Sequence, residues 1–591
     1  MVRFHAGAHH FFMIHPSPAL LKKADPATAF LALRWNEFFD RFTIDSFQPK
    51  LCNLPALVEE ILEVCDATNR HESSAGNLIS LQSEIAAPIE SAGGRGWITP
   101  FEAWKLDELR KVQTCGEAER IAKVLVGDGF RGKFENRIIA EAGKAPSLLP
   151  KQKGTADTIL GQLATIALHR GYLGSDNLEA AEKLFEKSPD NWMDGLLSRL
   201  QSRPQEYLVV VELTPTKKLS GAKLAKVMEK GGFTLEDPAC LAGITPLNGS
   251  VLLSVTITGT SPVAALQAVL RKTEPILDML AFYLADRAAD LPEHGWVGKA
   301  RTDVVKTLVP PQSLRLVHPH RYADRLVIDA LDSGSGNRLN GSVTNALELH
   351  STAMHSTDVR TRFLNLWAAL ECLASLVEES TIGRRVSALV CPVVTWRKVE
   401  KLGRYLAINL HLWGKASANE TKSSGASGRR LSTDQVIAAL CKPEKHEDIL
   451  ALFAIGGDHV LLNYRLYSAW GEFHDPGVLA KSMAASKERL EWHLKRIYRA
   501  RNLLVHRGIE VPRLESLCDN LHYYVSLLLS RVIHGVSRNE KWRPEDAVKH
   551  WQLTGHYVLD RLRHQPAALV FEDLMPTTTA EVASVSPWSH L

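Results

Sequence analysis

The segment from Leu490 to Gly508 carries the strongest helical pattern in the sequence. Its apolar residues recur at the spacings of one helix face, and they are Leu490, Leu494, Ile497, Leu504 and Val505. Gly508 is a typical residue after a helix C-terminus, and Pro512 indicates that the helix has ended. The pattern therefore predicts a long amphipathic helix, from about Lys481, with its apolar face toward a core.

Polar residues interrupt this pattern near its end. Arg501 lies four residues after Ile497, on the apolar face, where a charge is costly unless it is paired or functional. Asn502 and His506 are four residues apart and share another face with Arg499, three residues before Asn502. We expect Arg501 on the apolar side and Arg499 partly exposed.

The same segment is locally basic. Nine cationic residues stand against Glu488, Glu491 and Glu510, and they are Lys481, Lys487, Arg489, Lys495, Arg496, Arg499, Arg501, Arg507 and Arg513. The whole chain is nearly balanced, with 70 Lys and Arg against 66 Asp and Glu, so any attraction to nucleic acid must be local. The surplus predicts either a surface for an RNA backbone or a solvated helix face with Glu–Lys pairs.

An Arg followed after four to six residues by a His resembles the active-site signature of HEPN ribonucleases. The surrounding sequence is similar to the Apea-like HEPN branch over roughly residues 341–540, in three segments: Arg362–Glu371, Lys481–Gly508 and Leu514–Val536. The bare spacing also occurs at Arg287–His294, Arg315–His320 and Arg543–His550, but each of these contains or borders a proline and lacks the apolar stripe.

The resemblance implies a metal-independent endoribonuclease with no cofactor. Arg501 would stabilise the phosphate, His506 would act as acid or base toward the 2′-hydroxyl, and Asn502 would orient either the phosphate or His506. Arg499, Lys495, Arg496 and Arg507 would bind the substrate. It also implies a homodimer acting on RNA, with tRNA as a candidate, and an anti-phage effector released by a phage-derived trigger.

Three alternatives remain open at this point. In the first, Arg501 is a buried structural residue paired with Glu371, and His506 only interacts favourably with the dipole at the C-terminus of the helix. In the second, the helical region is a non-catalytic scaffold that binds RNA or protein. In the third, the chain is an enzyme whose site lies within residues 205–332.

The sequence predicts a mainly α protein with a smaller α/β or α+β middle domain. We expect a mostly helical sensor or regulatory region at 1–204, the middle domain at 205–332, and a HEPN-like helical domain at 341–563. Within the last, 414–432 reads as a mobile insertion, and 564–591 reads as a flexible tail. The β-rich runs 207–213 and 250–258 predict two strands of the middle domain.

The sequence contains no clear targeting signal or metal-binding motif. Eight cysteines are scattered without a Cys-x-x-Cys pair, which is typical of reduced structural thiols. We see no signal-peptide core and no apolar run of membrane-spanning length, so we expect a cytoplasmic protein without a membrane partner. We expect no metal site.

Overall fold

The structure is a computed structural model of the 591-residue chain. It describes residues 21, 24–39, 53–70, 76–149, 152–172, 174–216, 219–241, 244–284, 288–290, 292, 294–308, 341–356, 358–421, 431–441, 446–508, 511, 513–539 and 541–565. The chain divides into two compact units, one formed by residues 1–162 with 314–591 and the other by 163–313. Each unit is described by itself.

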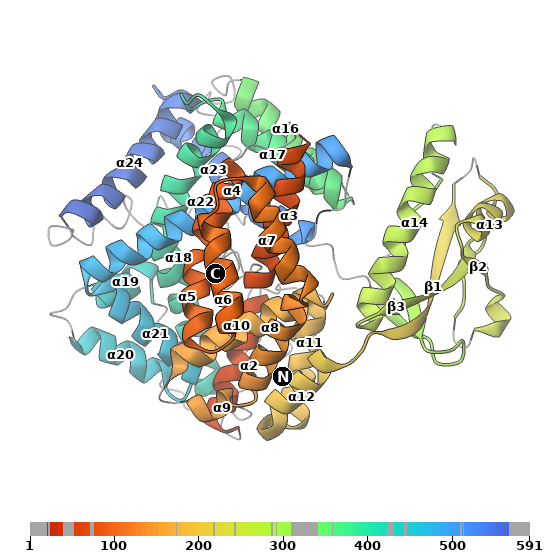
Figure 1. Cartoon of the computed structure of the whole chain (residues 1–591), viewed down its shortest axis with the longest axis horizontal. Coiled ribbons are helices and arrows are strands. Elements are labelled where there is room, and N and C mark those ends of the chain that lie inside the picture. The colour runs from red at the N-terminus through yellow and green to blue at the C-terminus, as the bar shows by residue number, and fades with distance from the viewer. Residues whose placement is uncertain are drawn as a thin grey trace. The chain divides into compact units, whose positions relative to one another are not determined.

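The first unit is helical throughout its described part (Figure 1). Its N-terminal helices are α2 (Pro26–Phe39), α3 (Leu54–Asn69), α4 (Gly76–Glu84), α5 (Ala86–Gly94), α6 (Pro100–Lys111), α7 (Cys115–Gly127), α8 (Phe130–Ala142), α9 (Ala145–Leu148) and α10 (Lys153–His169), of which α10 runs on into the second unit. Its C-terminal helices are α16 (Gly341–His355), α17 (Val359–Ala374), α18 (Ile382–Thr421), α19 (Thr433–Cys441), α20 (His446–Gly456), α21 (Val460–Phe473), α22 (Pro476–Arg507), α23 (Leu514–Arg538) and α24 (Pro544–His564).

The predicted basic helix is α22, and its ends follow local rules. The Asp475 carboxylate accepts hydrogen bonds from the first-turn N–H groups of Gly477 and Val478, and Pro476 occupies the first helical position. Gly508 ends the helix with φ 62°, a left-handed conformation that glycine adopts without strain. The helix and its glycine terminus are therefore confirmed, whereas Pro512 lies outside the described residues.

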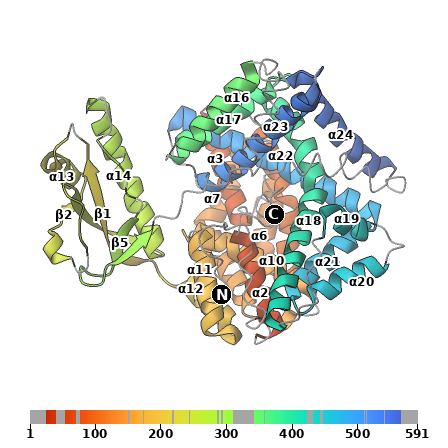
Figure 2. The same ribbon diagram turned by 180° about the vertical axis from the view of Figure 1, so that it is seen from behind.

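Long helices surround α22, with α18, α21, α23 and α24 among those packed against it, and α17 also contacts it (Figure 2). Helix α23 has a buried apolar face, with Leu517, Leu521, Tyr524, Val525 and Leu528 all at most 3% exposed. Phe363, Trp367 and Leu370 of α17 are buried as well. The expectation of a mainly helical protein is confirmed, since the helices predicted at 362–371 and 514–536 both form.

The predicted insertion at 414–432 is wrong in its first half. Helix α18 continues to Thr421, so the Gly- and Ser-containing sequence after Trp413 extends the helix rather than ending it. A single glycine costs a helix only about 1 kcal/mol, which neighbouring helix formers offset. Residues 422–430 lie outside the described part, as does the predicted tail beyond Gln565.

The N-terminal helices do not form a unit of their own. Residues 1–162 belong to the same compact unit as the helices after 341, and buried Glu37 of α2 shows why. Its carboxylate accepts a hydrogen bond from Arg465 Nη2 of α21 at 2.5 Å and another from the Tyr405 hydroxyl of α18. The first part of the predicted region 1–204 is thus built into the helical core.

The second unit contains an antiparallel sheet with helices. Its helices are α11 (Gly174–Lys187), η1 (Pro189–Asn191), α12 (Trp192–Gln201), α13 (Gly221–Lys230), η2 (Pro238–Cys240) and α14 (Pro262–Leu284), and its strands are β1 (Gln205–Pro215), β2 (Thr234–Leu235), β3 (Val251–Gly259), β4 (Ala289–Asp290), β5 (His294–Gly298) and β6 (Val305–Leu308). The strand order is β2-β3-β1-β5-β6, with β4 beside β1, and the neighbouring strands are antiparallel. Of the two architectures left open, the sheet therefore fits α+β. Residues 309–340, at the predicted end of this domain, are not described.

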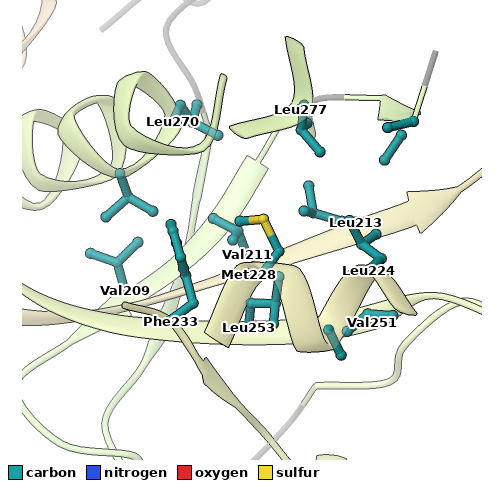
Figure 3. Close-up of a cluster of buried hydrophobic side chains, with 14 of the residues drawn as sticks. Val209, Val211, Leu213, Leu224, Met228, Phe233, Val251, Leu253, Leu270 and Leu277 are labelled. Atoms are coloured by element: carbon teal, nitrogen blue, oxygen red, sulfur yellow. The ribbon is translucent and has the colours of Figure 1, made fainter. Parts of the chain in front are cut away.

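The alternation of apolar residues along β1 explains how the sheet is covered. Val209, Val211 and Leu213 enter one buried cluster with Leu224 and Met228 of α13 and with α14 (Figure 3). Val210, which points to the opposite face, packs with Leu252 and Trp296 in a smaller cluster. Both predicted strands are confirmed, and each face of β1 has its own core.

Candidate functional site

Arg501 and Asn502 lie together near the C-terminal end of α22. Both are partly exposed, and Arg501 Nη1 donates a hydrogen bond to Asn502 Oδ1 at 3.2 Å. Within the described part of the chain, Arg501 forms no ion pair. Its charge is therefore neither buried nor neutralised by a carboxylate there.

Glu371 does not pair with Arg501 among the residues described, so that alternative is not supported. The Glu371 carboxylate instead accepts a hydrogen bond from Trp367 Nε1, one turn earlier on α17, at 2.6 Å. The Trp367 ring packs against Tyr498, with centroids 5.7 Å apart and planes tilted by 42°. Since Tyr498 precedes Arg501 by about one turn, this aromatic contact fixes α22 against α17 beside the candidate site.

The last turn of α22 leaves the core earlier than the apolar pattern predicts. Leu494, Ile497 and Leu504 are buried, but Val505 is 48% exposed and His506 is exposed. Arg501 lies on the side predicted to be apolar but is only partly buried, because a stripe extrapolated along the helix assumes that packing partners continue to its end. Arg501 and Asn502 are partly exposed and His506 is exposed, although Leu504 between them stays buried.

Arg496 and Arg499 behave in the opposite way. Both are buried, so the expectation that Arg499 is partly exposed is wrong. Arg496 binds Glu60 of α3 through two bonds of 2.6 and 2.8 Å, and its Nη2 also donates to Glu84 of α4 at 2.8 Å. Arg499 Nη2 lies 3.5 Å from the same Glu60 carboxylate. These arginines join α22 to α3 and α4, and this structure gives no support to a role in contacting RNA.

The other two expected binding residues lie nearer the surface. Lys495 is exposed, whereas Arg507 Nη1 pairs with Asp66 of α3 at 3.2 Å. The Asp66 side chain is 45% exposed, but the Arg507 side chain is only 11% exposed, so water reaches mainly the carboxylate of this pair. Of the expected binding residues, Lys495 is therefore exposed, whereas Arg507 is mostly buried beside Asp66.

The charges at the buried junction shift one another's ionisation. Burial opposes ionisation of Glu60, but the Arg496 and Arg499 guanidinium groups outweigh it and lower its pKa to about 2. Burial raises the pKa of Glu84 despite Arg496. Burial, assisted by Arg496, also lowers the pKa of His493 to about 3, so this histidine is neutral at neutral pH. Glu60 is the group that keeps its charge most firmly.

Sequence reasoning missed Glu60, Glu84 and Asp66. These acidic residues lie more than 400 positions from their arginine partners, and no local pattern links the two. The available signal is complementary charge: four acidic residues lie between 59 and 66, and the helix at 481–507 has a cationic surplus.

Comparison of the chain with protein-family models, with curated proteins and with solved structures finds no match. None of the described helices is both long and apolar enough to cross a membrane. In the described part of the chain, no group of three or more His, Cys, Asp or Glu side chains is arranged to hold a metal ion.

Proposed function

We propose that the chain is a metal-independent endoribonuclease of the HEPN type, with Arg501, Asn502 and His506 as its catalytic residues. The observation that carries the proposal is the contrast within α22. Its buried arginines have carboxylate partners, whereas Arg501 lies partly exposed beside an amide, one turn before an exposed histidine. A positive charge in that setting is available to a phosphate.

The proposed chemistry uses the RNA itself as the nucleophile. His506 accepts the proton of the 2′-hydroxyl, whose oxygen attacks the adjacent phosphorus; the P–O5′ bond breaks, and the departing 5′-oxygen takes a proton from water, to which the protonated His506 returns one. Arg501 binds the phosphate oxygens while negative charge builds on them, and Asn502 holds the Arg501 guanidinium through its amide oxygen. The products are a 2′,3′-cyclic phosphate and a 5′-hydroxyl.

A second copy of the chain completes the proposed site. The resemblance implies two HEPN units facing each other, so one chain with one motif suggests a homodimer about a two-fold axis. Exposed Val505 beside His506 offers an apolar contact close to such an axis. Monomers that cut RNA at the full rate would contradict this part of the proposal.

We also propose that the N-terminal helices restrain the enzyme. Asp66 occupies Arg507, the residue next to His506, and so competes with an RNA phosphate at the edge of the site. A phage-derived trigger and tRNA as substrate rest on the family resemblance alone, and cytoplasmic residence is proposed with them. The α+β unit is available as the sensing module.

The test is cleavage of a defined RNA by the purified full-length protein. We expect cutting that persists in EDTA, spares DNA of the same sequence and leaves cyclic phosphate ends, because the attacking group is the 2′-hydroxyl. Equal cutting of DNA, or loss of activity on chelation, rejects the mechanism. RNA binding without cleavage in both the wild-type protein and the Asp66→Asn variant favours the non-catalytic scaffold, because restraint alone would silence only the wild type.

A further inference from the structure

Two cysteines far apart in the sequence come together between α3 and α7. The two helices pack side by side (Figures 1 and 2). One turn beyond Cys65, Asn69 Nδ2 donates a hydrogen bond to Glu119 Oε2 at 3.0 Å, and Glu119 lies one turn beyond Cys115. This register places Cys65 opposite Cys115, where their thiols interact directly.

The surroundings of the two thiols differ. Cys65 is fully buried, whereas Cys115 is partly exposed at the first position of α7. Burial mainly, and the neighbouring Cys115 to a smaller extent, raise the pKa of Cys65 to about 12, so this thiol stays protonated at neutral pH. An oxidant in solvent therefore meets Cys115 first.

We propose that Cys65 and Cys115 form a reversible disulfide in response to peroxide, which makes the α3–α7 contact a redox modification site. This inference does not depend on the proposed ribonuclease activity. A lone exposed cysteine would stop at a sulfenic acid or react with another molecule, but here a second thiol is in place to resolve it.

The reaction balances with hydrogen peroxide as the oxidant. The Cys115 sulfur attacks one peroxide oxygen, the O–O bond breaks, and the departing hydroxide takes the thiol proton to leave as water. The Cys65 sulfur then attacks the sulfenic sulfur of Cys115, and the S–O bond breaks. The released hydroxide takes the Cys65 proton, so two thiols and one peroxide give one disulfide and two waters.

The bond would secure the helix that holds α22. Cys65 precedes Asp66, the partner of Arg507, and follows Glu60, the partner of Arg496, on the same helix. The bond would also close a loop between residues 65 and 115, and such a cross-link stabilises a fold chiefly by restricting the unfolded chain. Oxidation should therefore raise the melting temperature of the full-length protein by a few degrees.

The test is peptide mapping of the full-length protein after mild peroxide treatment, alkylation of remaining thiols and digestion with trypsin. We expect a linked pair of peptides, 51–70 and 112–120, that separates on reduction. Cys52 lies in the first peptide, so the Cys65→Ser variant assigns the bond by losing it. Cys372→Ser, a change at a partly exposed cysteine on α17, is the matched control and should keep the link.

Cys115→Ser provides a second arm, because this partly exposed position tolerates a hydroxyl even if the buried Cys65→Ser variant fails to fold. It should lose both the linked peptides and the rise in melting temperature on oxidation. The proposal is overturned if treated wild-type protein yields both peptides unlinked and alkylated. It is also overturned if the link persists in folded Cys65→Ser protein or in Cys115→Ser protein.

Discussion

The two halves of the last four turns of α22 make opposite use of the same residue type. Between His493 and Arg499, arginines lie in the core and meet carboxylates from α3 and α4. Between Arg501 and His506, the arginine and the amide are partly exposed and the histidine is exposed, although Leu504 stays buried. Position along the helix, rather than residue identity, separates cations that hold the fold from cations available to a ligand.

This comparison changes the meaning of the N-terminal region. Removing it would leave the buried Arg496 guanidinium without Glu60 and Glu84, and an uncompensated buried charge is strongly destabilising. A fragment beginning at Gly341 is therefore a poor test of restraint, because loss of the fold would accompany loss of the restraint. Point substitutions in the full-length chain separate the two effects.

The largest expected effect is on stability at the buried half. Arg496→Ala should lower the free energy of unfolding by about 3–5 kcal/mol, because it leaves Glu60 and Glu84 buried beside each other without their main partner. Urea denaturation measures this loss. Lys495→Ala, which removes a neighbouring exposed cation, is the control and should change stability by less than about 0.5 kcal/mol. Equal stability of the two variants would erase the distinction between the halves.

The next effect is on activity at the exposed half. Arg501→Ala should reduce the maximal cleavage rate by about 100-fold or more, because it removes charge stabilisation made mainly in the transition state. Its melting temperature should stay within a degree of the wild type, since Arg501 is partly exposed and forms no ion pair with the described residues. His506→Ala should behave in the same way.

The alternative with Glu371 predicts a different pattern. If the two residues depended on each other, Arg501→Ala would melt early, and the double variant Arg501→Leu with Glu371→Met would regain both fold and cleavage. We expect that double variant to fold and remain inactive. Recovery of cleavage would remove Arg501 from the catalytic residues.

Local pattern predicted the elements better than their surroundings. The apolar spacing and Gly508 predicted the position and the end of α22, and the β-rich run at 207–213 predicted β1, because these signals lie within one element. Burial of Arg499 and exposure of Arg501 depend on what packs against each turn. For Arg499 that partner is α3, more than 400 residues away, so the helical pattern assigned Arg499 to the wrong environment.

A smaller effect should appear in the dependence of stability on pH. The folded-state pKa of Glu60 is about 2, below its ordinary 4.5, so its contribution is complete above pH 4.5 and is lost as the pH falls toward 2. Between pH 6 and pH 4 the wild type should lose about 1 kcal/mol from this group. Glu84, with a raised pKa, acts in the opposite direction and reduces the net loss.

The variants Glu60→Gln and Glu84→Gln separate these contributions when urea midpoints are measured at each pH. Glu60→Gln should flatten the acid loss, whereas Glu84→Gln should steepen it. The same acid slope in Glu60→Gln as in the wild type would mean that Glu60 is not the carboxylate held charged by the buried arginines.

The smallest effect should come from the ion pair at the boundary of the two halves. Asp66→Asn removes one carboxylate partner of Arg507, whose side chain is 11% exposed, but the carboxylate itself is 45% exposed, so stability should fall by no more than about 1 kcal/mol. If Asp66 competes with RNA for Arg507, the variant should bind RNA more tightly, by less than about tenfold. The slope of log affinity against log salt concentration should steepen by the amount expected for about one more phosphate contact. Binding is measured in the His506→Ala background, so that the RNA stays intact.

Glu59→Gln is the matched control for this variant. It removes one negative charge from the same helix, but the Glu59 carboxylate accepts a hydrogen bond from Arg131 Nε of α8 at 2.7 Å and does not pair with α22. A general gain in positive charge would strengthen RNA binding equally in both variants, whereas competition at Arg507 acts in Asp66→Asn alone. Equal gains would therefore remove Asp66 as a restraint while leaving the assignment of Arg501 and His506 untouched.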